Sequence, residues 1–258
     1  MVNREEFIKK AKAGVQKAFS RRDLLIMQAV RSVDDLDETK NTLFTRVLDW
    51  TKFNFPEIDI SNEETLCAVI GRFGVKENFD YTALAEIVGD NKATELMEAA
   101  ENSYGAEFKA EDIKPLRELA AKTRELYIAR KELEKYVELA AKQIFPNICE
   151  LIDPLLTGRM ITTAGGLERF AKMPGSTIQV LGAEKALFKH LHKGSKPPKH
   201  GLLFQSPLVR DAKEDRRGRI ARALAAKLAI AAKADFYTHN SIGAKLRKDL
   251  DERISKIE

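Results

Sequence analysis

The feature that most constrains the fold of this chain is a stripe of mostly apolar residues through 116–144. Its nine positions alternate steps of three and four residues without a slip, and only Thr123 and Arg130 among them are polar. The stripe consists of Leu116, Leu119, Thr123, Leu126, Arg130, Leu133, Val137, Ala140 and Ile144. A stripe this narrow and this long predicts a helix of about 40 Å with a coiled-coil seam. The alternative is an ordinary bundle helix in a compact body.

A second stripe at helical spacing occupies residues 21–50. It is interrupted over Asp37–Thr42, and it stops near Pro56, which disfavours helix at the residue before it. Its apolar positions are Ile26, Val30, Val33, Leu36, Leu43, Val47 and Trp50. We expect the two long helices to pair as an antiparallel hairpin.

The rest of the chain has the pattern of short helices. Residues 57–110 contain repeated glycines, which predicts a small helical tip on the hairpin, and Ser61 with Glu64 has the spacing of a capping box. From Phe145 onward, short helical runs alternate with Gly and Pro stops. The predicted fold class is all-α, with a coiled-coil domain over residues 1–144 and a compact helical module over 145–258.

Several function classes lack support in the sequence. Neither GxxxxGK nor GxGxxG occurs, so no phosphate-binding loop is indicated, and no GxSxG supports a nucleophile, although a triad assembled in space stays open. His190 and His192 are two residues apart, so on a helix they cannot hold one metal ion, whereas on a strand they could. We therefore predict no catalytic residue, no metal site and no cofactor.

The sequence also points to a reducing compartment away from membranes. No apolar run approaches the roughly 20 residues that span a bilayer, and the charged start MVNREEFIKK differs from a secretory signal. The two cysteines, Cys67 and Cys149, are far apart and are expected to be small buried hydrophobic residues.

The positive charge is concentrated in the last third of the chain. Residues 176–258 carry 18 Lys and Arg against 9 Asp and Glu, a net of +9, so that residues 1–175 carry −4 of the total of +5. Segregated positive charge indicates a polyanion partner. A basic face that only keeps the protein soluble is the alternative.

Part of this charge lies in residues 182–207, which read GAEKALFKHLHKGSKPPKHGLLFQSP. The lysines of this stretch offer point charges to phosphates, and the Pro197-Pro198 pair stiffens the loop before its strand-like apolar end. The rings of His200 and Phe188 suit stacking on unpaired bases, with core packing as the alternative for Phe188.

A second basic element is the alanine-rich stretch 216–235, a strongly predicted helix. On a helix Arg216, Arg219 and Lys227 fall within an arc of about 80°, and Arg222 lies about 60° to the other side of Arg219. Guanidinium groups near a helix N-terminus bind phosphates through charge-assisted hydrogen bonds.

These same stretches carry a family resemblance. GAEKALFKHL at 182–191, PPKHGLLFQSPLV at 197–209 and RRGRIARALAAKLAIAAKAD at 216–235 resemble the signature of the Nop-domain family. That family includes the archaeal box C/D ribonucleoprotein scaffold, its eukaryotic nucleolar relatives and a spliceosomal splicing factor. The stretch SRRDLLIMQAVRSVDDLDETKNTL at 20–43 is similar to the family's coiled coil, and the archaeal form is the most similar.

The resemblance implies an RNA-binding scaffold and not an enzyme. It implies that the chain clamps a box C/D guide RNA, at its kink-turn, together with the kink-turn-binding protein, and supports RNA-guided 2′-O-methylation of rRNA. It further implies self-association through the coiled coil, a His200 ring against an RNA base, and an RNA-facing helix with Arg219, Arg222 and Lys227. The family motif at 186–189 usually ends in Arg, where this chain has Lys189. The expected RNA-binding residues are Gly182, Ala183, Glu184, Lys185, Phe188, Lys189, Lys196, Lys199, His200, Arg216, Arg219, Arg222 and Lys227.

Two further expectations concern partners and location. The archaeal scaffold has an N-terminal domain that holds fibrillarin, and the chain starts almost directly on the coiled coil, so we expect a fibrillarin-type methyltransferase as a partner only of full-length relatives. The expected location is cytoplasmic, or nucleolar or nuclear in a eukaryote. The alternative functions are a coiled-coil adaptor whose basic surface binds acidic protein, and a splicing-factor-like Nop protein.

Overall fold

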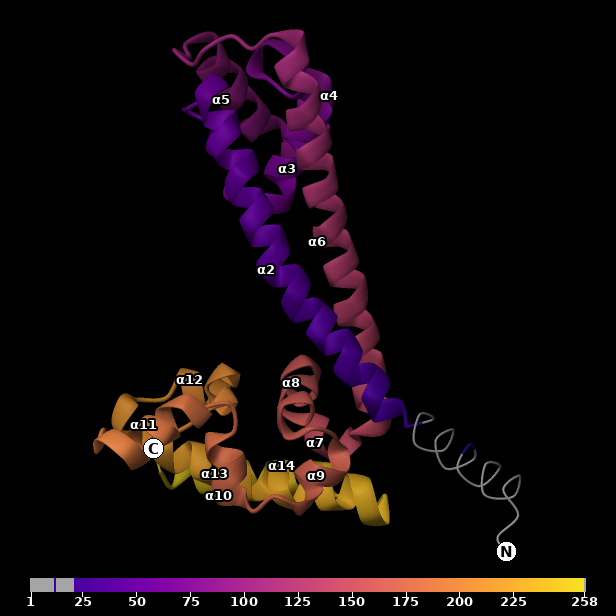
Figure 1. Ribbon diagram of the computed structural model, residues 1–258, viewed down its shortest axis with the longest axis vertical. Coiled ribbons are helices and arrows are strands. Elements are labelled where there is room, and N and C mark those ends of the chain that lie inside the picture. Colours follow the sequence, from indigo (N-terminus) through magenta and orange to yellow (C-terminus); the bar gives the residue numbers. More distant parts are fainter. Residues whose placement is uncertain (1–11, 13–20, 258) are drawn as a thin grey trace, which may run out of the picture. The chain divides into compact units, whose positions relative to one another are not determined.

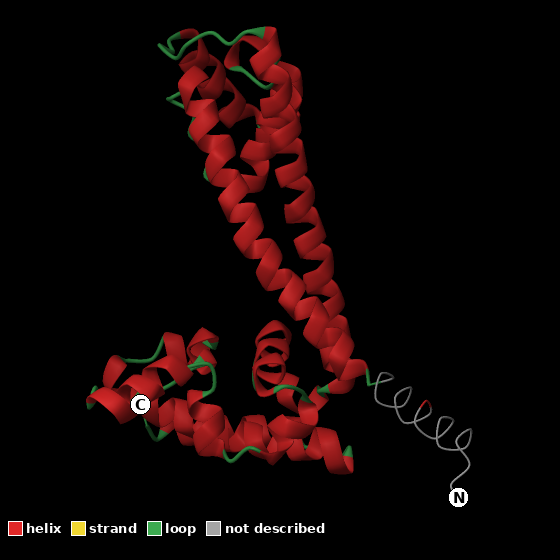
Figure 2. Cartoon of the chain, in the orientation of Figure 1, coloured by secondary structure: helices red, strands yellow, loops and turns green. Residues whose placement is uncertain are grey.

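The computed structural model describes residue 12 and residues 21–257, and within these the chain is helical with no strand (Figures 1 and 2). The predicted all-α fold class is confirmed for this part of the chain. The charged start MVNREEFIKK lies outside the described residues. None of the described helices is long and apolar enough to span a membrane.

The chain divides into two compact units whose boundaries fall inside the two long helices. We call Ser32–Glu132 the hairpin unit, and the described residues up to Arg31 together with those from Leu133 onward the module unit. The expected domain boundary at residue 144 stays a prediction.

The two long helices are α2 (Arg22–Asn54) and α6 (Ala110–Ile144). Within the hairpin unit they run antiparallel, as Figure 1 shows. Helix α6 begins six residues before the predicted stripe and includes Pro115 near its start. The apolar positions Val33, Val47 and Leu116 are fully buried, so the stripes form the seam that their spacing predicts.

A polar layer fills the interruption of the α2 stripe. The Arg130 Nε donates to Asp37 Oδ1 at 3.1 Å, and Lys40 Nζ lies 3.3 Å from the same oxygen. The Lys40 ammonium also lies 4.7 Å from the centre of the Tyr127 ring. Thr123, the other polar position of the seam, donates to its own helix at Leu119 O. The polar residues in the seam therefore have partners inside the hairpin unit.

The tip of the hairpin unit consists of α3 (Glu63–Phe73), η1 (Lys76–Asn78), α4 (Tyr81–Val88) and α5 (Asp90–Glu101). The predicted capping box at Ser61 is wrong, because Asn62 caps α3 by accepting a hydrogen bond from Thr65 N at 2.9 Å. Asn62 is therefore the N-cap of α3, one residue after the predicted Ser61, and asparagine is among the preferred residues at this position.

The module unit is built around one alanine-rich helix, α13 (Glu214–Lys233), which packs against α9, α10 and α14. Its small side chains allow close approach: a Cβ added to Gly175 at the start of α10 would lie 3.3 Å from Ala226 Cα. The other elements are α7 (Pro146–Cys149), α8 (Pro154–Ala164), α9 (Leu167–Lys172), α10 (Gly175–Val180), α11 (Glu184–Lys193), η2 (Leu202–Gln205), α12 (Pro207–Arg210), η3 (Ala234–Thr238) and α14 (Gly243–Ser255).

A buried polar network joins three elements of the module unit. The amide nitrogen of Asn147 in α7 donates to Asp235 Oδ1 in η3 at 2.7 Å. The amide oxygen accepts from the backbone N–H groups of Ile242 and Gly243, each at 2.7 Å, at the start of α14. Because Asn147 and Asp235 are both almost inaccessible to water, this network fixes α7, η3 and the start of α14 relative to one another.

Both cysteines are unpaired thiols. Burial raises the pKa of the Cys67 thiol and of the Cys149 thiol to about 12 each. The expectation of a buried residue is confirmed for Cys67, whereas Cys149 is half-buried; with raised pKa values, both thiols are unreactive.

Candidate nucleic-acid interface

Residues 182–201 leave the module core and return to the point where they left it. The N–H of Gly201 donates to Gln179 O at 3.0 Å, and that of Leu202 donates to Leu181 O at 2.8 Å. A Cβ on Gly201 would lie 2.0 Å from Leu181 O, so only glycine fits this close approach. The excursion, which contains α11 and the lysine-rich loop, is therefore anchored at both ends to α10.

The loop then lies against the first turns of α13. The side-chain amide of Gln179 donates to Lys199 O at 2.8 Å and lies 3.4 Å from Gly218 O. A Cβ on Gly218 would lie 3.5 Å from Lys199 Cβ. The structure thus brings together Lys199, His200 and the arginine-bearing end of α13, which the sequence separates. Gln179 joins them without belonging to any sequence pattern.

Helix α11 has no buried residue, and all but Leu187 and His190, which are half-buried, are exposed. The Phe188 side chain is 62% exposed and its ring lies against that of His192, tilted by 39° with the centroids 4.0 Å apart, so the alternative of core packing does not hold for Phe188. The carboxylate of Glu184 accepts from the Gly182 N–H at 2.8 Å. Gly194 ends the helix with a φ of +64°, a left-handed conformation that favours glycine.

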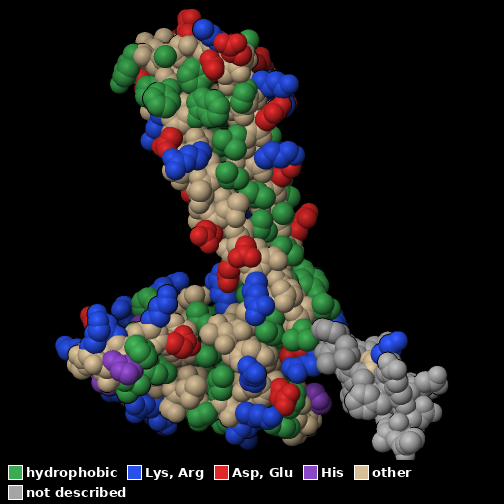
Figure 3. Space-filling model, viewed as in Figure 1, with side chains coloured by type: hydrophobic (Ala, Val, Ile, Leu, Met, Phe, Trp, Pro, Cys, Tyr) green, Lys and Arg blue, Asp and Glu red, His purple; other side chains and the backbone are tan. Residues whose placement is uncertain are grey.

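The cationic side chains of this region differ from those elsewhere in how they are paired. Within residues 21–257 the ion pairs include none of Lys185, Lys189, Lys196, Lys199, Arg216, Arg219 and Arg222. Lys227 is the exception among the predicted residues, because its ammonium donates to Asp249 Oδ2 in α14 at 2.9 Å. Figure 3 shows Lys, Arg and His side chains gathered over the end of the module unit that carries the α11 label in Figure 1.

His200 lies in a stack of three groups. Its ring is parallel to the Phe204 ring within 11°, with the centroids 4.7 Å apart, and the Arg217 guanidinium lies 5.3 Å from the Phe204 centroid. Burial lowers the pKa of His200, and the nearby charges of Arg217 and Lys199 lower it further. The prediction of a strand-like segment after the lysine-rich loop is wrong, because Phe204 belongs to the 3₁₀ helix η2. Phe204 and Arg217 were not among the predicted site residues.

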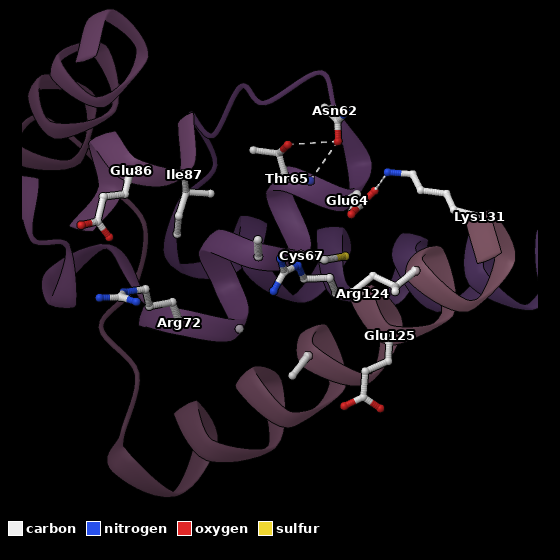
Figure 4. Close-up of a pocket in the computed structure, with 14 residues that line it drawn as sticks. Asn62, Glu64, Thr65, Cys67, Arg72, Glu86, Ile87, Arg124, Glu125 and Lys131 are labelled. Atoms are coloured by element: carbon white, nitrogen blue, oxygen red, sulfur yellow. Dashed lines mark hydrogen bonds and ion pairs between the residues drawn. The ribbon is translucent and has the colours of Figure 1, made fainter. Parts of the chain in front are cut away.

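Within the described part of the chain, neither a metal site nor the hollow of the hairpin unit offers a second polyanion site. Among the described residues no three His, Cys, Asp or Glu side chains are placed to hold a metal ion. A hollow of about 800 Å³ in the hairpin unit, shown in Figure 4, is lined by Arg72, Arg124 and Lys131 and by Glu64, Glu86 and Glu125. Its charges cancel, and Lys131 is paired with Glu64.

A comparison with known protein families shows which family the chain belongs to. Residues 32–256, most of the chain and both of its basic elements, match the Nop family, described as a snoRNA binding domain, fibrillarin. The chain belongs to the Nop family. Members of this family are RNA-binding scaffolds rather than enzymes, which agrees with the expectation from the sequence.

Curated relatives of the Nop chain come from archaea and fungi. It is 40% identical over 265 residues to an uncharacterized NOP5 family protein of Methanocaldococcus jannaschii, covering 99% of this chain and 64% of that relative. It is 37% identical over 243 residues to Nucleolar protein 58 of Scheffersomyces stipitis, covering 92% of this chain and 47% of the relative. The chain thus spans about half to two thirds of the length of these relatives.

A solved structure agrees with the fold. A crystal structure of a fibrillarin/Nop5p complex contains a chain that superimposes with a TM-score of 0.58 at 23% sequence identity, covering 98% of this chain and 79% of that one. The resemblance to the Nop family is therefore confirmed in sequence and in fold. The absence of an N-terminal fibrillarin-binding domain stays a prediction.

Proposed function

We propose that this Nop protein is an RNA-binding scaffold of a box C/D ribonucleoprotein, which clamps a kink-turn guide RNA together with its kink-turn-binding protein. The observation that carries the proposal is the absence of carboxylate partners for the cations of α11, the loop and the first half of α13, within the described chain. Cations without internal partners are free to release counterions from a phosphate backbone.

The two basic elements have different chemistry. Helix α11 and its loop present lysines, which act as mobile point charges, whereas α13 presents arginines, which bind phosphates with planar forks. Gly182 and Ala183 lead into α11, which begins at Glu184, and the Glu184 carboxylate accepts a hydrogen bond from the Gly182 N–H. We infer that RNA lies between the two elements and that His200 stacks on an unpaired base.

The second half of α13 suits the protein partner. An exposed ridge continues from Arg222 through Ala226, Ile230 and Lys233 of α13 to Tyr237 of η3 at steps of three and four residues. Ile230 is 46% exposed and Tyr237 is 55% exposed, while the small Ala226 permits close approach. Because aromatic and apolar anchors are typical of protein interfaces, this ridge supports a composite surface of RNA and the kink-turn-binding protein.

Further partners follow from the family. The solved relative was crystallised with fibrillarin, so we infer that a fibrillarin-type methyltransferase belongs to the same assembly, where this chain positions the RNA for 2′-O-methylation of rRNA. We also infer self-association through the long helices. In a eukaryote the assembly would be nucleolar, as the name of the fungal relatives indicates.

A gel shift with box C/D RNA, with and without the kink-turn-binding protein and at several salt concentrations, tests the proposal. Arg222→Glu should weaken binding and reduce the slope of log K against log salt by roughly one unit. Arg247→Glu is the matched control, because it makes the same charge change on a partly exposed arginine already paired with Asp251 at 3.1 Å.

The same experiment separates the alternatives. Equal slopes for the two variants would overturn the assignment of α13 as a phosphate contact. Binding with no RNA dependence would identify a protein-interaction adaptor. A preference for a spliceosomal kink-turn RNA over a box C/D RNA would move the chain to the splicing-factor branch.

A further inference from the structure

Phe204 and Arg217 lie beside the predicted RNA-binding ring, and contacts within the protein hold both of them. Phe204 is 37% exposed, and one of its contacts is the parallel ring of His200. Arg217 is the one arginine of the 216–222 group whose side chain is held by the protein: its Nε donates to Ala212 O at 3.0 Å. This bond holds the guanidinium over the Phe204 ring. We therefore do not assign Arg217 the phosphate-binding role of Arg216, Arg219 and Arg222.

We propose that Phe204 and Arg217 are positioning residues, which hold the His200 imidazole in one orientation so that its other face receives an unpaired RNA base. The inference rests on the proposed function and names the residues that prepare the site. Among the described residues, Phe204 is the aromatic ring stacked on His200, and the His200 side chain is only half-buried. We infer that the face of the imidazole opposite Phe204 is the one that receives the base.

The stack also controls the charge of His200. The charged groups that face it are Lys199 from its own loop and Arg217 from α13, both cationic, and Asp211 at the end of α12 lies near Arg217. Partial burial and these charges lower the pKa of His200, which keeps the ring neutral near pH 7. A neutral ring stacks on a base without removing a charge from water.

Nuclear magnetic resonance of the free chain tests the stack without RNA. In the wild type the imidazole should titrate below its ordinary value of 6.5. Phe204→Leu should raise this pKa and remove the ring-current shift of the His200 protons, and Phe204→Tyr should restore both. Phe188→Leu is the matched control, because it removes the other Phe ring that lies on a histidine, His192, and should leave His200 unchanged.

A double-variant cycle with box C/D RNA and the kink-turn-binding protein tests the consequence for binding. His200→Ala should weaken binding by about tenfold or more, as expected for loss of one base stack. Phe204→Leu and Arg217→Lys should each weaken it by about twofold to fivefold. In the His200→Ala background, both should have no further effect, because a ring that is absent needs no positioning.

The outcomes distinguish the inference from the proposed function. If Phe204→Leu leaves the His200 titration unchanged, or weakens binding equally with and without His200, then the positioning role is wrong while RNA binding stands. If His200→Ala binds like the wild type, then the base-stacking role fails and the positioning role fails with it. Circular dichroism of each variant checks that the helices are retained.

Discussion

Three cations of the hairpin unit and, in the module unit, the cations of α11 and its loop and the arginines of α13 are the same kinds of side chain, and they differ in whether a carboxylate of the protein holds them. In the hairpin unit, Arg130, Lys40 and Lys131 are each paired with a carboxylate of the same unit. In the module unit, the lysines of α11 and its loop and the arginines of α13 lack such partners within the described residues. The comparison teaches that the pairing of a charge, rather than its number, separates a stabilising residue from a binding residue.

The same distinction holds inside the module unit. Asn147, Asp235 and Asp23 are buried and fully engaged, and we assign them to folding. Arg219 and Arg222 are exposed and unengaged, and we assign them to RNA. Each assignment predicts which measurement a substitution changes, stability or binding. The following variants test that rule in order of expected effect.

Asn147→Ala should have the largest effect. It leaves the Ile242 and Gly243 N–H groups without their acceptor and removes a donor to Asp235, so we expect the free energy of unfolding to fall by about 3 kcal/mol or more. Denaturant unfolding measures the change. If the free energy of unfolding barely changes, then hydrogen-bonded buried polar groups do not stabilise the module unit. The distinction between residues for folding and residues for RNA would then fail.

Asp23→Asn should lower stability by about 2 kcal/mol at pH 7 through the loss of charge-assisted hydrogen bonds. Burial alone raises the pKa of Asp23, but hydrogen bonds from Arg21 and from Leu167 N outweigh it and lower the pKa overall. A lowered pKa means that the stabilisation is present above the unfolded value near 3.9 and is lost as pH falls through the folded value. The midpoint temperature of thermal unfolding should therefore fall more steeply between pH 7 and pH 3 for the wild type than for the variant.

Arg222→Gln and Lys227→Gln sharpen the comparison on a single helix. Arg222 is exposed, whereas Lys227 is paired with Asp249. We expect the Arg222 variant to bind RNA roughly tenfold more weakly and the Lys227 variant to change binding by less than about twofold. Equal losses measured by gel shift would show that the Asp249 pair opens when RNA binds, which would restore Lys227 to the interface.

Lys131→Gln should have the smallest effect. Its pair with Glu64 is on the surface of the hairpin unit, where the lysine side chain is 59% exposed, so stability should change by no more than about 0.5 kcal/mol. RNA affinity should be that of the wild type. A loss of RNA affinity comparable with that of Arg222→Gln would extend the RNA-binding surface to the hairpin unit and remove the contrast between the units.

The periodic features of the fold follow from the sequence. The steps of three and four residues predict α2 and α6 and their antiparallel pairing, and the alanine-rich stretch predicts α13. These features are readable because a helix repeats locally, so that residues three and four apart share a face whatever the rest of the chain does. The segregation of positive charge in the last third is likewise a property of the sequence alone.

The tertiary structure decided which of those charges are available. Arg219 and Lys227 fall within one arc of about 80° on a helical projection, and only the packing of α14 against α13 places Asp249 beside Lys227. The contacts of Phe204 and Arg217 likewise depend on the tertiary structure. The 3₁₀ helix η2 carries Phe204, and the Ala212 carbonyl holds Arg217 over the Phe204 ring, beside His200. The physical reason is that pairing, burial and stacking depend on residues far apart in the chain, whose meeting is a property of the folded core and not of any local spacing.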